Sequence, residues 1–206
     1  MRYQGYEIKS KPTVYGDTVF RSVLEARWAV FMDLLAVRYE YEPYCSVVGT
    51  DLYEVAYKPD FVLTDLIFTI EIKPRKPNRL ELIKMYSWAA CVGDVIVFFD
   101  FNQPNGKTTS GWRVSYDDDV RCGCYDEMYW WCECPRCCKI DICECGQIDC
   151  GCFSNDEFNE MYLEGTKYEY KFEHSPNILT AFKLAKKYNF PSKKRVKPLS
   201  RIRLLV

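Results

Sequence analysis

Residues 54–73 read EVAYKPDFVLTDLIFTIEIK, and this stretch contains two apolar runs separated by Thr64 and Asp65. The runs, 54–63 and 66–72, are rich in β-branched and aromatic residues, which favour strands. A short polar connection between two such runs is typical of an antiparallel hairpin. The second run is almost entirely apolar, so it predicts a buried strand.

Apolar periodicity and turn residues predict six further elements around this hairpin. They are a helix over 18–36, a strand over 39–42, a helix over 79–92, a strand over 95–99, a strand over 112–116 and a basic helix over 177–189. Asp17 or Thr18 is the expected cap of the first helix, and Gly93 the expected stop of the second. The run 95–99 is apolar throughout, which is typical of a central or parallel strand. The expected fold class is therefore α/β.

The hairpin carries two acidic residues and a lysine that suit phosphodiester hydrolysis. That reaction needs a divalent cation, and magnesium takes few carboxylates and keeps several waters. Asp60 on the first strand and Glu71 on the second can converge on one ion. Lys73 lies two residues beyond Glu71 and so shares its face of the strand. A lysine in that position orients water or stabilises developing negative charge.

The Glu-x-Lys pattern by itself is a weak signal. It occurs three times, at 7–9, 71–73 and 169–171, and only the middle copy ends an apolar strand whose partner carries a Pro-Asp pair. Ionisable groups at the end of a buried strand need a partner or a metal to offset desolvation. The alternative is an exposed strand end with a solvated salt bridge.

Five stretches together resemble the phage- and virus-encoded branch of the PD-(D/E)XK nuclease-like superfamily. They are FRSVLEARWAVFMDLL (20–35), YEYEP (39–43), YKPDFVL (57–63), IEIKPRKP (70–77) and ILTAFKLAKKYNF (178–190). The resemblance extends from about residue 15 to residue 190. It implies a restriction-endonuclease-like core, in which helices flank a mixed central sheet.

The resemblance also implies a complete active site. In that superfamily a glutamate of the first helix completes the metal site, and Glu25 stands in that position. Asp60 and Glu71 would hold Mg²⁺ or Mn²⁺, with Glu25 as a further or water-mediated ligand. Lys73 would assist the attacking water. The expected catalytic residues are thus Glu25, Asp60, Glu71 and Lys73.

Several basic residues near this motif have two interpretations. Arg21 or Arg27 would be a surface partner of Glu25 if that residue binds no metal. Lys84, on the second predicted helix, either helps to bind phosphate or is a solvated surface lysine. A phosphate-contacting rim is expected from the residues that follow the Glu-x-Lys motif, Arg75, Lys76 and Arg79.

Ten of the 12 cysteines lie within residues 122–152. Such dense CxC pairs, in a sequence with no apparent signal peptide, favour metal thiolates over disulfides. Residues 134–137 read CPRC, the form of a zinc knuckle, in which two thiolates reach one tetrahedral ion. Ten thiols exceed one site, so two zinc ions are expected, with an iron–sulfur cluster as the less favoured alternative. The expected ligands are Cys122, Cys124, Cys132, Cys134, Cys137, Cys138, Cys143, Cys145, Cys150 and Cys152.

The cysteine-rich stretch divides the chain into an expected core, 1–116 and 175–206, and a zinc-binding insertion, 117–174. With so few apolar residues the insertion needs metal to fold, so its simplest role is structural. Contact with DNA or with a protein is the alternative. Its aromatic residues, Tyr129, Trp130 and Trp131, would stack on bases or, more commonly, pack against the core. Cys45 and Cys91, outside the cluster, are expected to be buried apolar residues.

Charge is distributed unevenly along the chain. Net charge is −1, but residues 175–206 contain no Asp or Glu and nine lysines and arginines. Such a stretch indicates an anionic partner or a solvated terminus. No leader pattern and no apolar run long enough to cross a bilayer is present, so an intracellular location without a membrane partner is expected. A viral origin, implied by the resemblance alone, would add host cytoplasm, nucleus or virion.

Three functions follow, in order of preference. The first is a Mg²⁺-dependent deoxyribonuclease, an endonuclease by expectation, with DNA as partner, RNA not excluded and a homodimer possible. The second is a non-catalytic nucleic-acid-binding or virion-associated protein that keeps the nuclease fold. The third is a zinc-dependent interaction protein. The form of the substrate, and which cysteine joins which ion, are not readable from the sequence.

Overall fold

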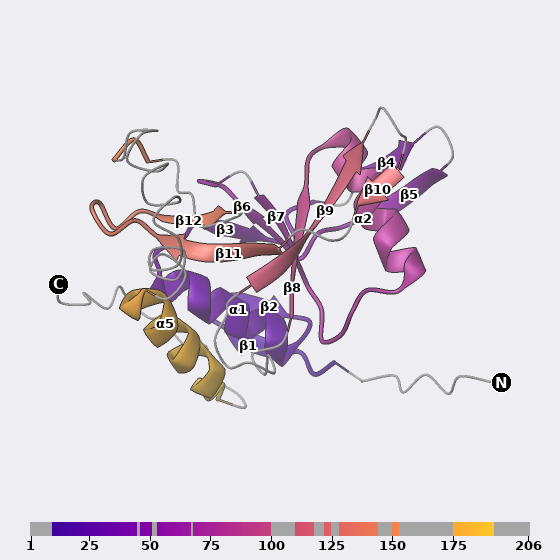
Figure 1. Cartoon of the computed structure of the whole chain (residues 1–206). Coiled ribbons are helices and arrows are strands. Elements are labelled where there is room, and N and C mark those ends of the chain that lie inside the picture. Colours follow the sequence, from indigo (N-terminus) through magenta and orange to yellow (C-terminus); the bar gives the residue numbers. More distant parts are fainter. Residues whose placement is uncertain are drawn as a thin grey trace.

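The computed structural model describes residues 10–44, 46–50, 53–66, 68–99, 110–117, 122–124, 128–143, 150–152 and 175–191. These residues form a mixed α/β fold (Figure 1). The elements are β1 (Thr13–Tyr15), β2 (Thr18–Phe20), α1 (Val23–Leu34), β3 (Tyr39–Tyr41), β4 (Ser46–Thr50), β5 (Tyr53–Tyr57), β6 (Phe61–Leu63), β7 (Phe68–Ile72), α2 (Arg79–Cys91), β8 (Val95–Phe98), β9 (Ser110–Asp117), β10 (Cys122–Cys124), β11 (Met128–Glu133), β12 (Ile140–Cys143) and α5 (Pro176–Lys187).

The central sheet follows the order β12-β11-β9-β8-β7-β6-β3, and β10 pairs with β9 beside it. The pair β7–β8 is parallel, with Glu71 opposite Val97, and the other pairs along the sheet are antiparallel. A parallel pair needs a crossover, and α2 is that crossover. The predicted hairpin of β6 and β7 and the predicted parallel strand β8 are confirmed.

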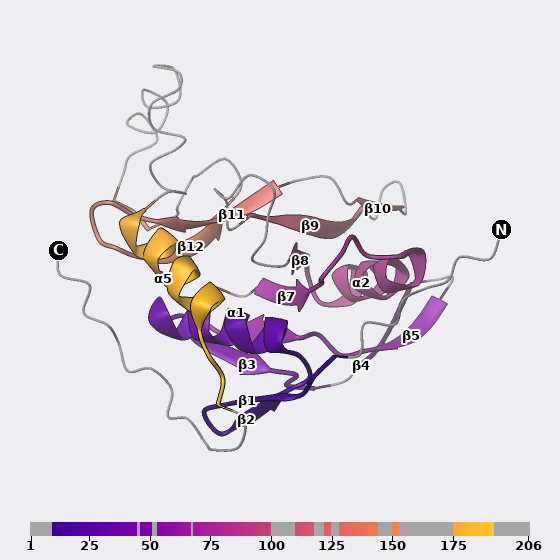
Figure 2. The ribbon, with the colours of Figure 1, turned by 90° about the horizontal axis from the view of Figure 1, so that it is seen from below.

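Helices cover the two faces of the sheet. On one face α1 packs against the sheet and α5 lies beside α1, as Figure 2 shows. This face holds the large core cluster, in which Trp28 and Phe31 meet Phe98 and Trp131. On the other face Met85 and Trp88 of α2 join a second core cluster with side chains of β8 and β9. Burying each such side chain contributes roughly 1.5–3 kcal/mol, so both layers stabilise the sheet.

The first helix begins later than its apolar pattern predicts. Residues 18–20, expected to be helical, form β2, which pairs with β1 around Gly16 at a φ of 60°. The cap is Ser22, whose Oγ accepts a hydrogen bond from the Glu25 N–H at 3.1 Å. The expected caps Asp17 and Thr18 were wrong because a Thr-Val-Phe triplet beside a tight turn prefers a hairpin.

The stretch 54–63, expected as one strand, is two strands. β5 ends at Tyr57 and pairs with β4, forming a separate hairpin that contacts α2. The chain leaves that hairpin at Lys58 and Pro59 and enters β6 at Phe61. Proline lacks the N–H that a ladder requires, so a break at Pro59 has a local cause. Asp60 therefore lies in the link between two strands rather than within one.

β8 and β9 approach each other closely at Gly111, which faces Phe98 across the ladder. A Cβ at this position would lie 2.7 Å from Cγ2 of Ile96 and 2.9 Å from the Phe98 ring. The glycine thus lets the Phe98 ring fill the core between the sheet and Trp28. The strand here, Ser110–Asp117, is longer than the predicted 112–116.

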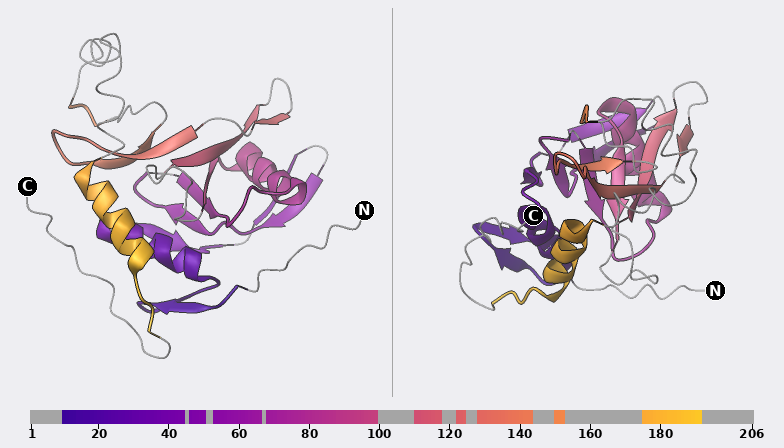
Figure 3. Two further views of the ribbon diagram at one scale, coloured as in Figure 1. Left: turned by 60° about the horizontal axis from the view of Figure 1, so that its bottom comes forward. Right: turned by 60° about the vertical axis from the view of Figure 1, so that its left-hand side comes forward.

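Strands β11 and β12 lie within residues 117–174 and continue the central sheet beyond β9. Trp131 of β11 is fully buried against Phe31 and Phe98, so it packs in the core as the commoner expectation had it. The final helix α5 begins at Pro176, with Ser175 as its cap, and lies diagonally across α1 in Figure 3. Its lysines 183, 186 and 187 are exposed.

Candidate functional site

Asp60 is buried at the junction where the chain passes from the β4–β5 hairpin into the sheet. The residue is 1% exposed, and its Oδ2 accepts a hydrogen bond of 2.7 Å from the Ile72 N–H. Its Oδ1 is ion-paired with the guanidinium of Arg21. The contact with Ile72 places Asp60 directly beside the end of β7, which carries Glu71.

Glu71 lies on β7 and is 5% exposed. Its Oε2 accepts a hydrogen bond of 2.6 Å from the Tyr57 hydroxyl, and its Oε1 is ion-paired with Lys73. The backbone N–H of Lys73 donates to the Phe98 carbonyl at 2.9 Å, which continues the parallel pairing one residue past β7. The sheet thereby holds the lysine beside the carboxylate.

Glu25 lies in the first turn of α1 and is also buried. Its Oε1 accepts from the Ser22 hydroxyl at 2.7 Å, and its Oε2 accepts from the Tyr41 hydroxyl at 2.5 Å. Of the two arginines expected as partners, Arg21 forms the pair, at 3.9 Å. The helix dipole favours a carboxylate in the first turn, so α1 itself stabilises the negative charge of Glu25.

Arg21 joins these carboxylates together. Its guanidinium pairs with Asp60 and, at 2.6 Å, with Glu42, in addition to its contact with Glu25. We refer to Glu25, Glu42, Asp60 and Glu71 as the acidic cluster. Lys58 also contacts this cluster, through an ion pair of 2.5 Å with Glu42. The structure thus gathers all four predicted catalytic residues and adds Arg21.

The electrostatics of the acidic cluster follow from burial. Burial and the nearby Glu71 raise the pKa of Asp60 well above its usual range, although Lys73 and the Ile72 N–H oppose the shift. Burial lowers the pKa of Lys73, but Glu71 and Asp60 outweigh it and the net shift is upward. The pKa of Tyr57 is also raised well above its ordinary value. Burial is the larger cause, and the negative charge of Glu71 is the second.

The acidic cluster consists of hard oxygen donors, which is the donor chemistry that Mg²⁺ and Mn²⁺ prefer. Among the described residues, the carboxylates do not form a group of three with all ligand atoms within 4.8 Å; only the cysteines discussed below do. Magnesium usually takes one or two carboxylates and several waters, and Asp60 and Glu71 offer carboxylate oxygens. Arg21 and Lys73 neutralise these two carboxylates here.

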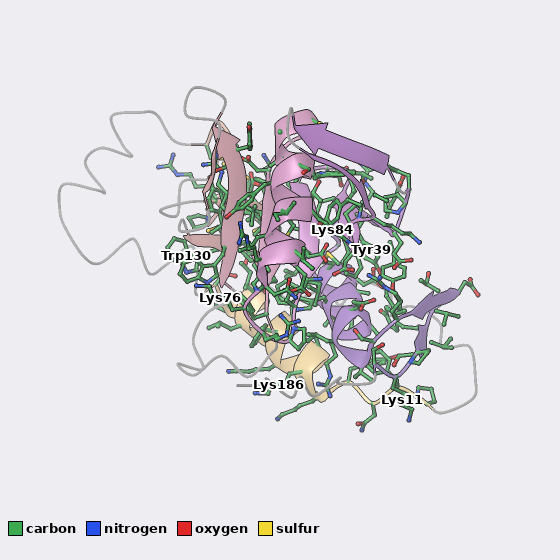
Figure 4. The ribbon with its side chains drawn as sticks, turned by 90° about the vertical axis from the view of Figure 1, so that its right-hand side faces the viewer. Lys11, Tyr39, Lys76, Lys84, Trp130 and Lys186 are labelled. Carbon is green, nitrogen blue, oxygen red and sulfur yellow. The ribbon has the colours of Figure 1, made fainter. Side chains whose placement is uncertain are left out.

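The expected phosphate-contacting rim follows the acidic cluster in sequence. Lys76, Arg79 and Lys84 are exposed, and Arg75 is exposed and pairs with Glu81 at 3.0 Å. Figure 4 shows Lys76 and Lys84 on the side of the molecule that carries α2. Their exposure fits either interpretation of these residues, contact with phosphate or simple solvation.

Sequence reasoning missed three members of this site. Glu42 is a member of the acidic cluster that pairs with Arg21, and Tyr41 and Tyr57 donate hydrogen bonds to Glu25 and Glu71. A tyrosine two residues before Pro59 could have been noticed as a hydrogen-bond donor. No periodicity, however, indicates that Tyr57 turns toward Glu71, because β5 belongs to a different hairpin.

A second constellation lies at the tip of the β11–β12 hairpin. The Sγ atoms of Cys134, Cys137, Cys150 and Cys152, the cysteine cluster, all lie within 4.8 Å of one another. Tetrahedral zinc with bonds of about 2.3 Å places its sulfurs about 3.8 Å apart. These four cysteines can therefore hold a metal ion, and their arrangement is compatible with zinc.

The knuckle itself is the hairpin turn. The Cys134 N–H donates to the Lys139 carbonyl at 2.9 Å, and the Cys138 N–H donates to the Cys134 carbonyl at 2.8 Å. Cys138 adopts a φ of 58°, which lets the chain reverse tightly. Burial raises the pKa of Cys134, but the N–H groups of Cys137 and Arg136 prevail and lower it to about 7. That environment favours a thiolate, the form that binds metal.

The other cysteines divide into three groups. Cys132 and Cys143 are buried beside the cysteine cluster, and Cys138 is exposed. The side chains of Cys122 and Cys124, and Cys145 and Cys45 as a whole, lie outside the described residues. Cys91 is exposed at the end of α2, so the expectation that it is buried was wrong.

Comparison with family models, with curated proteins and with solved structures finds no match for this chain. Among the described residues, no helix has both the length and the apolar character that crossing a membrane requires.

Proposed function

We propose that the protein is a metal-dependent nuclease with a PD-(D/E)XK-like site and a restriction-endonuclease-like core. The observation that carries the proposal is the burial of Asp60 and Glu71 beside Lys73. Taking carboxylates out of water costs several kcal/mol per ion unless a partner offsets it. A fold that gathers them at one end of a parallel strand, with a lysine at hand, is suited to binding a divalent cation.

The residues would divide the work as follows. Asp60 and Glu71 would hold Mg²⁺ or Mn²⁺, which when bound polarises a phosphodiester and activates water. Lys73, a cation at neutral pH, would orient the attacking water and stabilise charge that develops on phosphate. Glu25, fixed by Ser22 and Tyr41, would be a further or water-mediated ligand. The proposed substrate is DNA.

We also propose zinc as the ion of the cysteine cluster, with a structural role. The hairpin tip around Cys134 continues the central sheet, so fixing it would fix the end of that sheet. Soft thiolates favour zinc over magnesium, which separates the two proposed metals chemically. A second zinc would need Cys132, Cys143 and cysteines beyond the described residues. Metal analysis of purified protein distinguishes one zinc, two zincs and an iron–sulfur cluster.

One observation favours a second candidate function, a nucleic-acid-binding protein that does not cleave. Arg21 and Lys73 already neutralise Asp60 and Glu71, as they would in a site that serves only to hold the fold together. The exposed lysines of α5 and α2 would then supply the contacts to phosphate. This candidate predicts binding to DNA that is insensitive to magnesium.

The test is cleavage of labelled linear, circular and branched DNA with Mg²⁺, Mn²⁺ or EDTA. Wild-type protein is compared with Lys73→Ala and with the matched control Lys11→Ala, an exposed lysine that Figure 4 shows well apart from Lys84. We expect metal-dependent cleavage that Lys73→Ala reduces about 100-fold or more and Lys11→Ala leaves intact. Binding without cleavage in every metal would instead support the second candidate.

A further inference from the structure

Arg21 stands out because its guanidinium contacts three of the four carboxylates of the acidic cluster. It pairs with Asp60, Glu42 and Glu25, which come from three different segments of the chain. Its side chain is 55% exposed, whereas that of Asp60 is 2% exposed. The arginine therefore reaches from solvent onto a buried carboxylate.

The backbone of Arg21 makes hydrogen bonds of its own. Its N–H donates to Glu25 Oε2 at 3.2 Å and to the Tyr41 hydroxyl at 2.9 Å, in the short link between β2 and the cap of α1. The side chain can consequently change partners without moving the helix. Arginine suits such a role because its planar fork matches carboxylate and phosphate equally well.

Charge balance gives the reason for an exchange. The network contains four carboxylates, Glu25, Glu42, Asp60 and Glu71, and three cations, Arg21, Lys58 and Lys73. A divalent ion on Asp60 and Glu71 would add two positive charges within a few ångströms of the guanidinium. Like charges at such distances repel by more than thermal energy, so metal and guanidinium compete for Asp60.

We propose that Arg21 is an exchangeable counter-ion of the metal site. It neutralises Asp60 while no divalent cation is bound, and it transfers to a phosphate of the nucleic acid when the cation takes its place. The proposal rests on the proposed nuclease function and adds to it a phosphate-contacting residue whose availability depends on metal. Metal and nucleic acid then bind cooperatively, because each takes over one half of an existing ion pair.

The first test measures Mn²⁺ affinity by electron paramagnetic resonance on zinc-loaded protein. Removing a competing cation in Arg21→Ala should raise the affinity about tenfold. The matched control is Lys58→Ala, which removes a cation from the same network but one that pairs with Glu42 and not with Asp60. We expect less than about a threefold gain there. Arg21→Lys, which keeps the charge without the fork, should fall between wild type and Arg21→Ala.

The second test measures DNA binding in a Lys73→Ala background, which prevents cleavage. Adding Arg21→Ala should weaken binding about tenfold with Mn²⁺ and leave binding in EDTA unchanged. An unchanged or weaker Mn²⁺ affinity in Arg21→Ala, an equal gain in Lys58→Ala, or an equal loss of DNA binding in EDTA would overturn the exchange. Failure of the nuclease proposal would give a different result. Mn²⁺ binding that depends on Asp60, tested with Asp60→Asn, would then be absent from both wild type and Arg21→Ala.

Discussion

The acidic cluster and the cysteine cluster are both arrangements of potential metal ligands, but they are built in opposite ways. The acidic cluster draws on α1, the residue that follows β3, the link before β6 and the end of β7, and its carboxylates are mostly buried. The cysteine cluster comes from residues 134–152 and lies at a hairpin tip, with Cys137 exposed. The core assembles the acidic cluster, whereas a hairpin turn supplies two ligands of the cysteine cluster and Cys150 and Cys152, beyond β12, supply the other two.

This difference indicates which of the two clusters needs a bound ion in order to fold. The carboxylates of the acidic cluster are paired by Arg21, Lys58 and Lys73, so the surrounding core can form before any metal binds. Among the described residues, the cysteine cluster packs against Trp130, Cys132 and Cys143, and four crowded thiols do not replace a metal as a cross-link. Under the proposed functions, we expect zinc to be required for folding at the hairpin tip and magnesium to be required for activity alone.

The largest effect should come from breaking the cysteine cluster. Cys134→Ser removes a buried residue of the proposed zinc site, so the protein should lose zinc and more than about 3 kcal/mol of stability, a fall in Tm of roughly 10 °C. Zinc content and thermal unfolding measure both. The control is Cys91→Ser, an exposed cysteine on α2 that should change stability by less than about 0.5 kcal/mol. Equal behaviour of the two variants would mean that the cysteine cluster holds no structural ion.

A smaller effect should follow from separating the hairpin tip from α5. Glu133, next to Cys134, accepts hydrogen bonds from Ser175 and, at 2.6 Å, from Asn177 at the start of α5. Glu133→Gln weakens these charge-assisted bonds and should cost about 1–2 kcal/mol. Hydrogen exchange of the α5 amides should accelerate, whereas the control Glu40→Gln, at an exposed position of β3, should leave it unchanged. Unaltered exchange in Glu133→Gln would show that α5 docks through its apolar face alone.

The smallest effect concerns the acidic cluster without metal. Here the substitution should raise the stability of the protein, whereas the two preceding substitutions should lower it. Because the folded-state pKa of Asp60 is raised, the folded protein binds a proton more tightly than the unfolded chain. Stability should therefore fall as the pH rises from about 4, the unfolded value, through the folded pKa. Asp60→Asn removes this dependence and should stabilise the protein by about 1 kcal/mol at pH 7, with a smaller difference at pH 4.

Urea unfolding across this pH range measures the effect, and magnesium supplies the control. Adding Mg²⁺ in EDTA-free buffer should stabilise wild type and leave Asp60→Asn unchanged, because ligand binding to the folded state alone raises stability. A destabilised Asp60→Asn at pH 7 would mean that the pair with Arg21 outweighs desolvation. The acidic cluster would then be structural in the same sense as the cysteine cluster.

The apolar pattern predicted the strands β3, β6, β7 and β8 and both later helices because each has one clear periodicity. It failed at residues 18–20, where the same apolar residues satisfy a helix and a hairpin equally well, and the β1 partner decides between them. It also missed β4, whose pairing with β5 takes the first half of the stretch 54–63 out of the central sheet. Pairing partners that lie elsewhere in the chain are not encoded in local periodicity.

By itself, the sequence determined the chemistry available at each site. It predicted Asp60 and Glu71 as ligands of a hard ion with the cation Lys73 beside them, and the CPRC turn as half of a thiolate site. Only the tertiary structure decided that Arg21 lies on Asp60, that Tyr57 bonds Glu71, and that Cys150 and Cys152 complete the cysteine cluster. The physical reason is that composition and spacing set the types of ligand present. The residues that pair with those ligands are set by burial in the packed core, because a buried polar group needs a partner.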